Sequence, residues 1–213
     1  MTCPESNATV CVVDDDDAFR DSLVWLLQTA GYQVAAYSSG ETLLAHWHPD
    51  QPGCILLDIR MPGMTGLELQ SELARRHYTT PVVFITGHGD VPMAVTALQK
   101  GAFHFLEKPF NDHALLDVVT QAINVDRARR SERARKRTVV ARLERLTPRE
   151  REVMKCVVAG KLNKVTADEL GVSIKTVEAH RSQLMKKLGV DSTAQLVRLL
   201  LDLGEEADRS NAP

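Results

Sequence analysis

Asp58 follows a short apolar run, and this placement makes it the first candidate for chemistry. The run Ile55–Leu57 suits a strand that is buried on both faces of a parallel sheet. A Pro-Gly turn comes next, and Thr65 with Glu68 forms a capping box that begins the following helix. Asp58 is therefore expected at the carboxyl end of a central strand, where open α/β sheets bind their ligands.

Polar side chains also follow three other apolar runs. They are Asp14 and Asp15 after Val10–Val13, Thr86 after Val82–Ile85, and Glu107 with Lys108 after Phe103–Leu106. If the strands are parallel neighbours, one sheet edge gathers carboxylates, a hydroxyl and an ammonium. Closely packed carboxylates repel each other unless a cation intervenes. Mg²⁺, a hard ion that prefers oxygen ligands, is the expected cation, and Thr86 and Lys108 would face any anion that joins Asp58.

A carboxylate after a strand has a plainer role, because Asp is common as a helix N-cap or turn residue. We prefer that interpretation for Asp16 and Asp17, which precede a helix that begins near Ala18. Helix caps alone do not explain the other strand-end residues, because carboxylates, a hydroxyl and an ammonium follow one another at successive strand ends. The pattern favours a functional site.

Strands and helices alternate along the first part of the chain. The expected strands are Thr9–Val13, Gln33–Tyr37, Ile55–Leu57, Val82–Thr86 and Phe103–Leu106, and the helices include Ala18–Ala30, Gly66–Arg76 and one capped by Asp90. This alternation predicts an α/β fold with a doubly wound five-stranded parallel sheet. The flavodoxin-like strand order 2-1-3-4-5 would place the first and third strands side by side, and so Asp15 near Asp58.

Charge divides the 213 residues into two parts. Residues 1–125 hold 6 Lys and Arg against 15 Asp and Glu, whereas residues 126–213 hold 20 against 13. An acidic front part and a basic back part indicate two domains with different partners, the second suited to nucleic acid. We expect no membrane span, no secretory signal and buried free cysteines, which together indicate a cytoplasmic protein.

The back part reads as four capped helices after a basic linker. Thr147 and Glu150 form a capping box, Ser173 caps a helix over Ile174–Leu188, and Ser192 precedes the last helix. A short helix, a Gly-containing turn and a longer helix are typical of a helix-turn-helix domain, although a plain four-helix bundle predicts the same caps. The expected divisions are residues 8–124, a helical basic linker at 125–141 with a disordered tether as the alternative, a DNA-binding domain at 142–207, and a tail at 208–213.

Several of these motifs resemble a known family. Asp14-Asp15, Asp58 in Asp-x-x-Met-Pro-Gly-x-x-Gly, Thr86-Gly87 and Lys108-Pro109 resemble a two-component receiver domain, and the segment Thr86-Gly-His-Gly-Asp-Val-Pro-Met-Ala-Val95 resembles the FixJ-like subgroup. Thr176-Val-Glu-Ala-His-Arg181 with Lys186-Lys-Leu188 resembles a LuxR-type helix-turn-helix domain. The resemblance covers the whole chain and implies a response regulator of the NarL/FixJ family.

The resemblance implies roles for individual residues. A sensor histidine kinase would phosphorylate Asp58, with Mg²⁺ held by Asp15, Asp58 and the backbone carbonyl of Arg60, and Asp14 acting mainly through water. Lys108 would neutralise charge, and Thr86 would hydrogen-bond the phosphoryl oxygen. Phe105 occupies the family's aromatic switch position and would turn inward, after which homodimers form.

The LuxR-type resemblance implies that Ile174–Leu188 enters the major groove of double-stranded promoter DNA. Val177, Leu184 and Leu188 lie near one helical face and should pack inward, away from the DNA. The expected DNA-contacting residues are Lys175, Thr176, Glu178, Ala179, Arg181, Ser182 and Lys186. RNA polymerase is a further candidate partner.

Two other functions compete with this interpretation. A Mg²⁺-dependent phosphatase that forms an aspartyl-phosphate shares the Asp, Mg²⁺ and Lys, but that class carries a second Asp where this chain has Arg60. A receiver that acts only through protein contacts would not need the basic back part. We therefore expect a regulator rather than an enzyme, apart from catalysis of its own phosphorylation and dephosphorylation.

Overall fold

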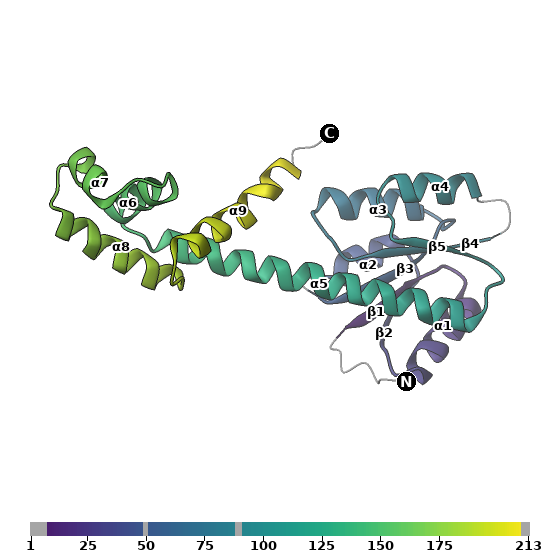
Figure 1. Cartoon of the computed structure of the whole chain (residues 1–213). Coiled ribbons are helices and arrows are strands. Elements are labelled where there is room, and N and C mark those ends of the chain that lie inside the picture. Colours follow the sequence, from purple (N-terminus) through teal and green to yellow (C-terminus); the bar gives the residue numbers. More distant parts are fainter. Residues whose placement is uncertain (1–7, 49–50, 88–90, 210–213) are drawn as a thin grey trace. The chain divides into compact units, whose positions relative to one another are not determined.

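The computed structural model describes residues 8–48, 51–87 and 91–209. Two compact units divide the chain, Met1–Ser131 and Glu132–Pro213. Within the described ranges, strands occur in the first unit alone (Figure 1). None of the described helices combines the length and the apolar character needed to span a membrane. The predicted cap Asp90 and the cysteine Cys3 lie outside the described residues.

The first unit contains the predicted parallel sheet. Its strands are β1 (Thr9–Val13), β2 (Gln33–Tyr37), β3 (Gly53–Asp58), β4 (Val82–Thr86) and β5 (His104–Glu107). The strand order β2-β1-β3-β4-β5 is confirmed, and every neighbouring pair is parallel. The helices are α1 (Asp17–Thr29), α2 (Gly40–His46), α3 (Gly66–Arg75), α4 (Val91–Gln99) and the beginning of α5 (Asp112–Glu144).

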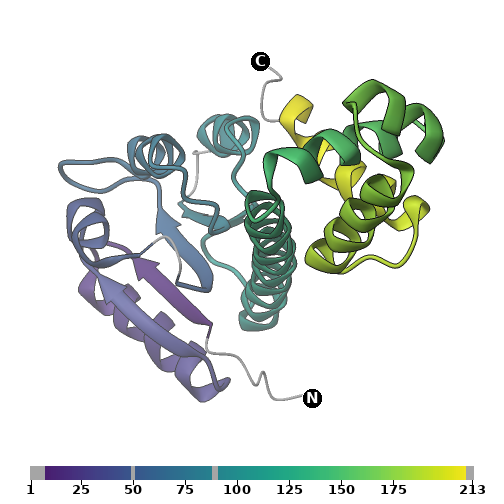
Figure 2. The same cartoon turned by 90° about the vertical axis from the view of Figure 1, so that its left-hand side faces the viewer.

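Helices cover both faces of this sheet (Figure 2). Alternate strand residues such as Val10, Val12 and Leu56 pack against α1 and α5, whereas Cys11, Ile55 and their equivalents pack against α2, α3 and α4. This period of two along strands that are buried on both sides explains why the runs are apolar throughout. The polar residues are consequently concentrated at the strand ends.

Side-chain caps fix the start of α1 and of α3. The Asp16 side chain accepts from the backbone N–H groups of Ala18 and Phe19, so it caps α1 as predicted. Thr65 and Glu68 form the predicted capping box of α3. The fifth strand is shifted by one residue from the prediction, because pairing of Glu107 with Thr86 extends it beyond the apolar run.

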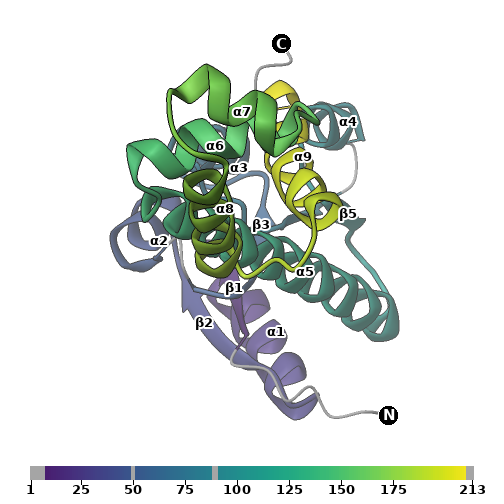
Figure 3. The same cartoon turned by 60° about the vertical axis from the view of Figure 1, so that its left-hand side comes forward.

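The second unit is helical within the described residues, with α6 (Pro148–Val158), α7 (Asn163–Leu170), α8 (Ile174–Leu188) and α9 (Thr193–Arg209) after the end of α5. Helix α8 packs against α6 and α7 (Figure 3). Gly171 ends α7 with φ +64°, a conformation that glycine adopts without strain, and begins the turn into α8. These helices form the predicted helix-turn-helix.

The first part of the predicted linker belongs to the first unit instead. Asp126 is 1% exposed, and its carboxylate accepts from the backbone N–H of Gly53 at 2.9 Å and from Arg130 Nε at 2.6 Å. Gly53 has φ +150°, and a Cβ there would lie 1.9 Å from the Thr9 carbonyl oxygen. The helical linker predicted from residue 125 therefore begins within the first unit, where Asp126 anchors α5 to the start of β3.

Replacing Asp126 with Ala should lower the free energy of unfolding of the first unit by about 1–3 kcal/mol, because the Gly53 N–H would remain buried without a partner. Urea unfolding of the full chain followed by tryptophan fluorescence measures this, since Trp25 and Trp47 both lie in the first unit. Asp117→Ala, an exposed position on the same helix, is the matched control and should change stability by less than about 0.5 kcal/mol. Equal effects of the two substitutions would show that the anchor contributes nothing.

Candidate functional site

Asp58 is the last residue of β3, and its two carboxylate oxygens have different partners. Oδ1 accepts from Lys108 Nζ at 3.0 Å, and Oδ2 accepts from the backbone N–H of Arg60 at 2.6 Å. The side chain is 11% exposed, so one edge of the carboxylate still reaches solvent. A carboxylate held in this way is oriented and remains accessible to an incoming electrophile.

Lys108 joins the strand ends. Its Nζ donates to Asp14 Oδ2 at 3.0 Å as well as to Asp58 Oδ1, so one ammonium bridges two carboxylates. The same Nζ lies 3.8 Å from the ring centroid of Phe19 in α1. A cation above an aromatic face is stabilised by the ring quadrupole, and the ring thereby limits the positions that the ammonium can take.

Asp14 is itself fixed by the beginning of α1. Its side chain is 4% exposed, and Oδ1 accepts from the backbone N–H of Asp16 at 2.9 Å. Arg20 donates to the Asp14 carbonyl oxygen at 2.7 Å. Sequence reasoning placed Asp14 at the site but did not identify Phe19 or Arg20. Their positions on α1, a few residues after Asp14, could have indicated that they lie near the site.

The remaining predicted residues take different places. Thr86 is buried at the end of β4, with its hydroxyl donating to the Gly87 carbonyl at 3.2 Å. Phe105 is half-buried in β5 and packs against the core beneath α4. Asp15, unlike Asp14, is exposed, because successive residues at a strand end point in opposite directions. The site therefore brings together Asp14, Asp58 and Lys108, with Asp15 outside this cluster.

The donor set is compatible with Mg²⁺. The predicted ligands Asp14, Asp15, Asp58 and the Arg60 carbonyl are all oxygen donors, as this hard cation requires. Among the described side chains, no group of three His, Cys, Asp or Glu residues is gathered as a metal cluster. This ligand set, which includes a backbone carbonyl and the exposed Asp15, stays a prediction.

Burial and charge act in opposite directions on Asp58. Burial raises the pKa of its carboxyl, Lys108 and the Arg60 N–H lower that pKa, and the charge of Asp14 raises it, with a net shift above the usual value. Burial lowers the pKa of Lys108, but its hydrogen bonds to Asp58 and Asp14 raise it more, so Lys108 stays charged. The ammonium is therefore the fixed charge of the site.

Family comparisons assign both units. Residues 10–120 match the model described as response regulator receiver domain, and residues 144–200 match bacterial regulatory proteins of the luxR family. The transcriptional regulatory protein FixJ of Azorhizobium caulinodans is 42% identical over 94% of this chain and 95% of its own length. The chain belongs to the NarL/FixJ family of response regulators. Its two units are a receiver domain and a LuxR-type DNA-binding domain.

Other relatives of this response regulator agree. Nodulation protein W of Bradyrhizobium diazoefficiens is 43% identical over 96% of this chain and 90% of its own length. The solved structure of the response regulator StyR is 44% identical, with a TM-score of 0.86 over 92% of this chain and 98% of that chain. The crystal structure of full-length FixJ from B. japonicum is 38% identical, with a TM-score of 0.58, and the match covers 93% of this chain and 98% of that chain.

In the DNA-binding domain, α8 has the two faces that its sequence predicts. Val177, Leu184 and Leu188 are buried in the core of the unit. The predicted contact residues Lys175, Glu178, Ala179, Ser182 and Lys186 are exposed, and Thr176 and Arg181 are half-buried. This exposed face is available to a partner.

Two predicted DNA contacts also have internal partners. Arg181 donates to Asn163 Oδ1 at 3.2 Å and to Thr193 Oγ1 at 2.7 Å, so it connects α8 with α7 and α9. The Thr176 backbone N–H donates to the Ser173 hydroxyl at the helix cap. Both residues therefore help to position α8, whatever they contact on DNA.

The raised pKa of Asp58 gives stability a specific pH dependence. A carboxyl whose pKa is higher in the folded chain stabilises the fold most while it is protonated, and the contribution is lost as pH rises through the folded pKa. Asp58→Asn is neutral at every pH, so near pH 7 its free energy of unfolding should exceed that of the wild type. The excess should shrink as pH falls to about 4, near the unfolded pKa.

Urea unfolding followed by tryptophan fluorescence at a series of pH values measures this difference. Asp21→Asn, an exposed position on α1, is the control and should not give a pH-dependent gain. A stability difference between Asp58→Asn and the wild type that is constant from pH 4 to 7 would show that the pKa of Asp58 is not raised in the folded chain.

Proposed function

We propose that this response regulator is a transcription factor controlled by phosphorylation of Asp58. A sensor histidine kinase supplies the phosphoryl group, and the phosphorylated protein forms a homodimer that binds promoter DNA through α8. The observation that carries the proposal is the Asp58 carboxylate, which is oriented by Lys108 and Arg60 at the carboxyl end of β3. RNA polymerase is a further candidate partner at the promoter.

The transfer step uses these contacts directly. An Asp58 oxygen attacks phosphorus, an O–P bond forms, and the P–N bond to the kinase histidine breaks, with the electron pair leaving on the imidazole. The Lys108 ammonium, held by Asp14, faces the added negative charge and lowers the barrier electrostatically. Bound Mg²⁺ would neutralise further phosphoryl charge, held by Asp14, Asp15, Asp58 and the Arg60 carbonyl.

Thr86 is the proposed reader of the phosphorylated state. Its buried hydroxyl donates to the neighbouring Gly87 carbonyl. A phosphoryl oxygen on Asp58 would replace that carbonyl as the acceptor, because a charged acceptor forms the stronger hydrogen bond. Phe105 on the adjacent strand would then turn inward and alter the surface formed by α4 and β5. Thr86 therefore acts after the transfer and not during it.

Asp58 should take up one phosphoryl group from acetyl phosphate in the presence of Mg²⁺, and Asp58→Asn should take up none because an amide is a poor nucleophile. Intact-mass spectrometry of the full chain measures both. Thr86→Ala is the matched variant, which should be labelled like the wild type yet dimerise weakly in sedimentation. Equal labelling of Asp58→Asn and the wild type would overturn the assignment of the phosphorylation site.

Glu178→Ala should weaken binding to a cognate DNA site by about 1–3 kcal/mol, because Glu178 would accept a hydrogen bond from a cytosine amino group. Its affinity for random DNA should not change. Lys186→Ala should weaken binding to cognate and to random DNA alike, because phosphate contacts carry no sequence information. It should also reduce the slope of log affinity against log salt concentration by roughly 1, because one phosphate contact is lost. Fluorescence anisotropy at several salt concentrations measures these effects. If Glu178→Ala changes neither affinity, or Lys186→Ala affects the cognate site alone, α8 does not dock in this way.

A further inference from the structure

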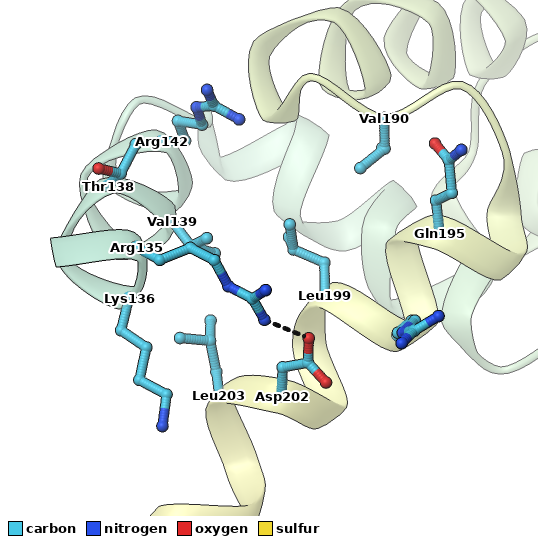
Figure 4. A pocket seen from close by; sticks show the side chains of 11 residues that line it. Arg135, Lys136, Thr138, Val139, Arg142, Val190, Gln195, Leu199, Asp202 and Leu203 are labelled. Carbon is cyan, nitrogen blue, oxygen red and sulfur yellow. Dashed lines mark hydrogen bonds and ion pairs between the residues drawn. The ribbon is translucent and has the colours of Figure 1, made fainter. Parts of the chain in front are cut away.

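The DNA-binding unit has a pocket between the end of α5 and α9 that the regulatory mechanism does not use. Its volume is about 430 Å³, within the range of small-molecule sites (Figure 4). The lining residues are Arg135, Lys136, Thr138, Val139, Arg142, Val190, Gln195, Arg198, Leu199, Asp202 and Leu203. All of them belong to the second unit.

The inner surface of this pocket is apolar. Val139 of α5 and Val190, which precedes α9, are 9% and 7% exposed. Leu199 and Leu203 are half-buried and lie four residues apart, so they share one face of α9. Figure 4 shows both leucine side chains extending from α9 toward α5. An apolar surface of this kind favours a hydrocarbon or aromatic body.

The charged residues of the lining carry an excess of cations. Four cations line the pocket with one acid, Asp202, which already accepts from Arg135 at 2.8 Å (Figure 4). Lys136 pairs with Glu132 at 3.2 Å, so Arg142 and Arg198 are the cations that can meet an added anion. Arg142 donates from Nη1 to the Leu188 carbonyl at 3.0 Å, which leaves its other N–H groups as donors. Arg198 lies one helical turn before Asp202. Within the described part of the chain, its guanidinium makes no hydrogen bond or ion pair.

We propose that this pocket binds a small amphiphilic organic anion. The carboxylate or sulfonate of the ligand pairs with the guanidinium of Arg198, and Arg142 on α5 is a second candidate donor. Its apolar body lies along Val139, Leu199 and Leu203. The bound molecule thus contacts α5 and α9 together, in a domain that the proposed function assigns only to DNA.

Charge and polarity favour this occupant over two others. A second copy of the chain would bring the same excess of cations to the pocket, and like charges oppose association. A DNA phosphate would satisfy Arg198 but would leave the valine and leucine side chains uncovered. An anion with an apolar body matches both parts of the lining.

The test compares three probes with different head groups on the full-length protein. Decanoate and 2-naphthoate are anionic with an aliphatic and an aromatic body, and decyltrimethylammonium carries the decanoate chain length on a cation. Methyl NMR signals of Val139, Val190, Leu199 and Leu203 should shift with one or both anions and not with the cation. The preferred anion distinguishes a fatty-acid ligand from an aromatic acid.

Arg198→Glu should weaken binding of the preferred anion by about tenfold or more, because a charged hydrogen-bond donor is replaced by a repelling group. Lys155→Glu makes the same charge change at an exposed position of α6 outside the pocket and should alter affinity by less than about twofold. Both positions are exposed, and unchanged methyl spectra of the free variants establish that they fold.

Several results would overturn the proposal. They are equal binding of anionic and cationic probes, shifts confined to methyl groups elsewhere, and equal effects of Arg198→Glu and Lys155→Glu. Pocket signals that shift with protein concentration alone would identify a second copy as the occupant. Signals that shift with DNA and with none of the probes would assign Arg198 to phosphate contact. Because no phosphorylation is involved, these outcomes are independent of Asp58.

Discussion

The site of the receiver domain is organised by one ammonium between two carboxylates. Asp14 and Asp58 come from adjacent parallel strands, and both contact Lys108 Nζ at 3.0 Å. Without that cation, two largely buried carboxylates would share a small volume, and at least one would protonate. A protonated Asp58 is a poor nucleophile, so this charge balance is a condition for the proposed phosphorylation.

The surrounding structure holds the three groups at that spacing. Strands buried on both faces fix the register that places Asp58 beside the end of β1, and the backbone N–H groups of Arg60 and Asp16 each hold one carboxylate oxygen. The second unit uses a similar device. Lys187 of α8 donates to Glu150 of α6 at 2.7 Å, and Glu150 also closes the capping box with Thr147. This ion pair connects the cap of α6 with the helix that we propose enters DNA.

Sequence patterns predicted the sheet because its runs are apolar on both faces and end at polar residues. They also placed Asp14, Asp58, Thr86 and Lys108 at strand ends, since parallel strands end at a common edge. They favoured Asp15 as the carboxylate near Asp58, whereas Asp14 shares Lys108 with Asp58 and Asp15 is exposed, because neighbouring carboxylates differ only in the direction that the backbone gives them. Asp126 was missed because its partner is the Gly53 N–H, 73 residues away along the chain, and a backbone group has no sequence signature. The pocket beside α9 was also missed, because its lining comes from two segments that are far apart along the chain, residues 135–142 and 190–203.

The most direct test of the charge balance is the pKa of the Asp58 carboxyl, measured by carbon NMR in the wild type, Lys108→Met and Lys100→Met. Lys100 is exposed and is not among the partners of the site, so its replacement controls for the loss of one positive charge. We predict that Lys108→Met raises the pKa of Asp58 above its already elevated value, because burial and the charge of Asp14 then act without opposition from the ammonium. Lys100→Met should leave that pKa unchanged. An Asp58 pKa in Lys108→Met that equals or falls below the wild-type value would contradict the account.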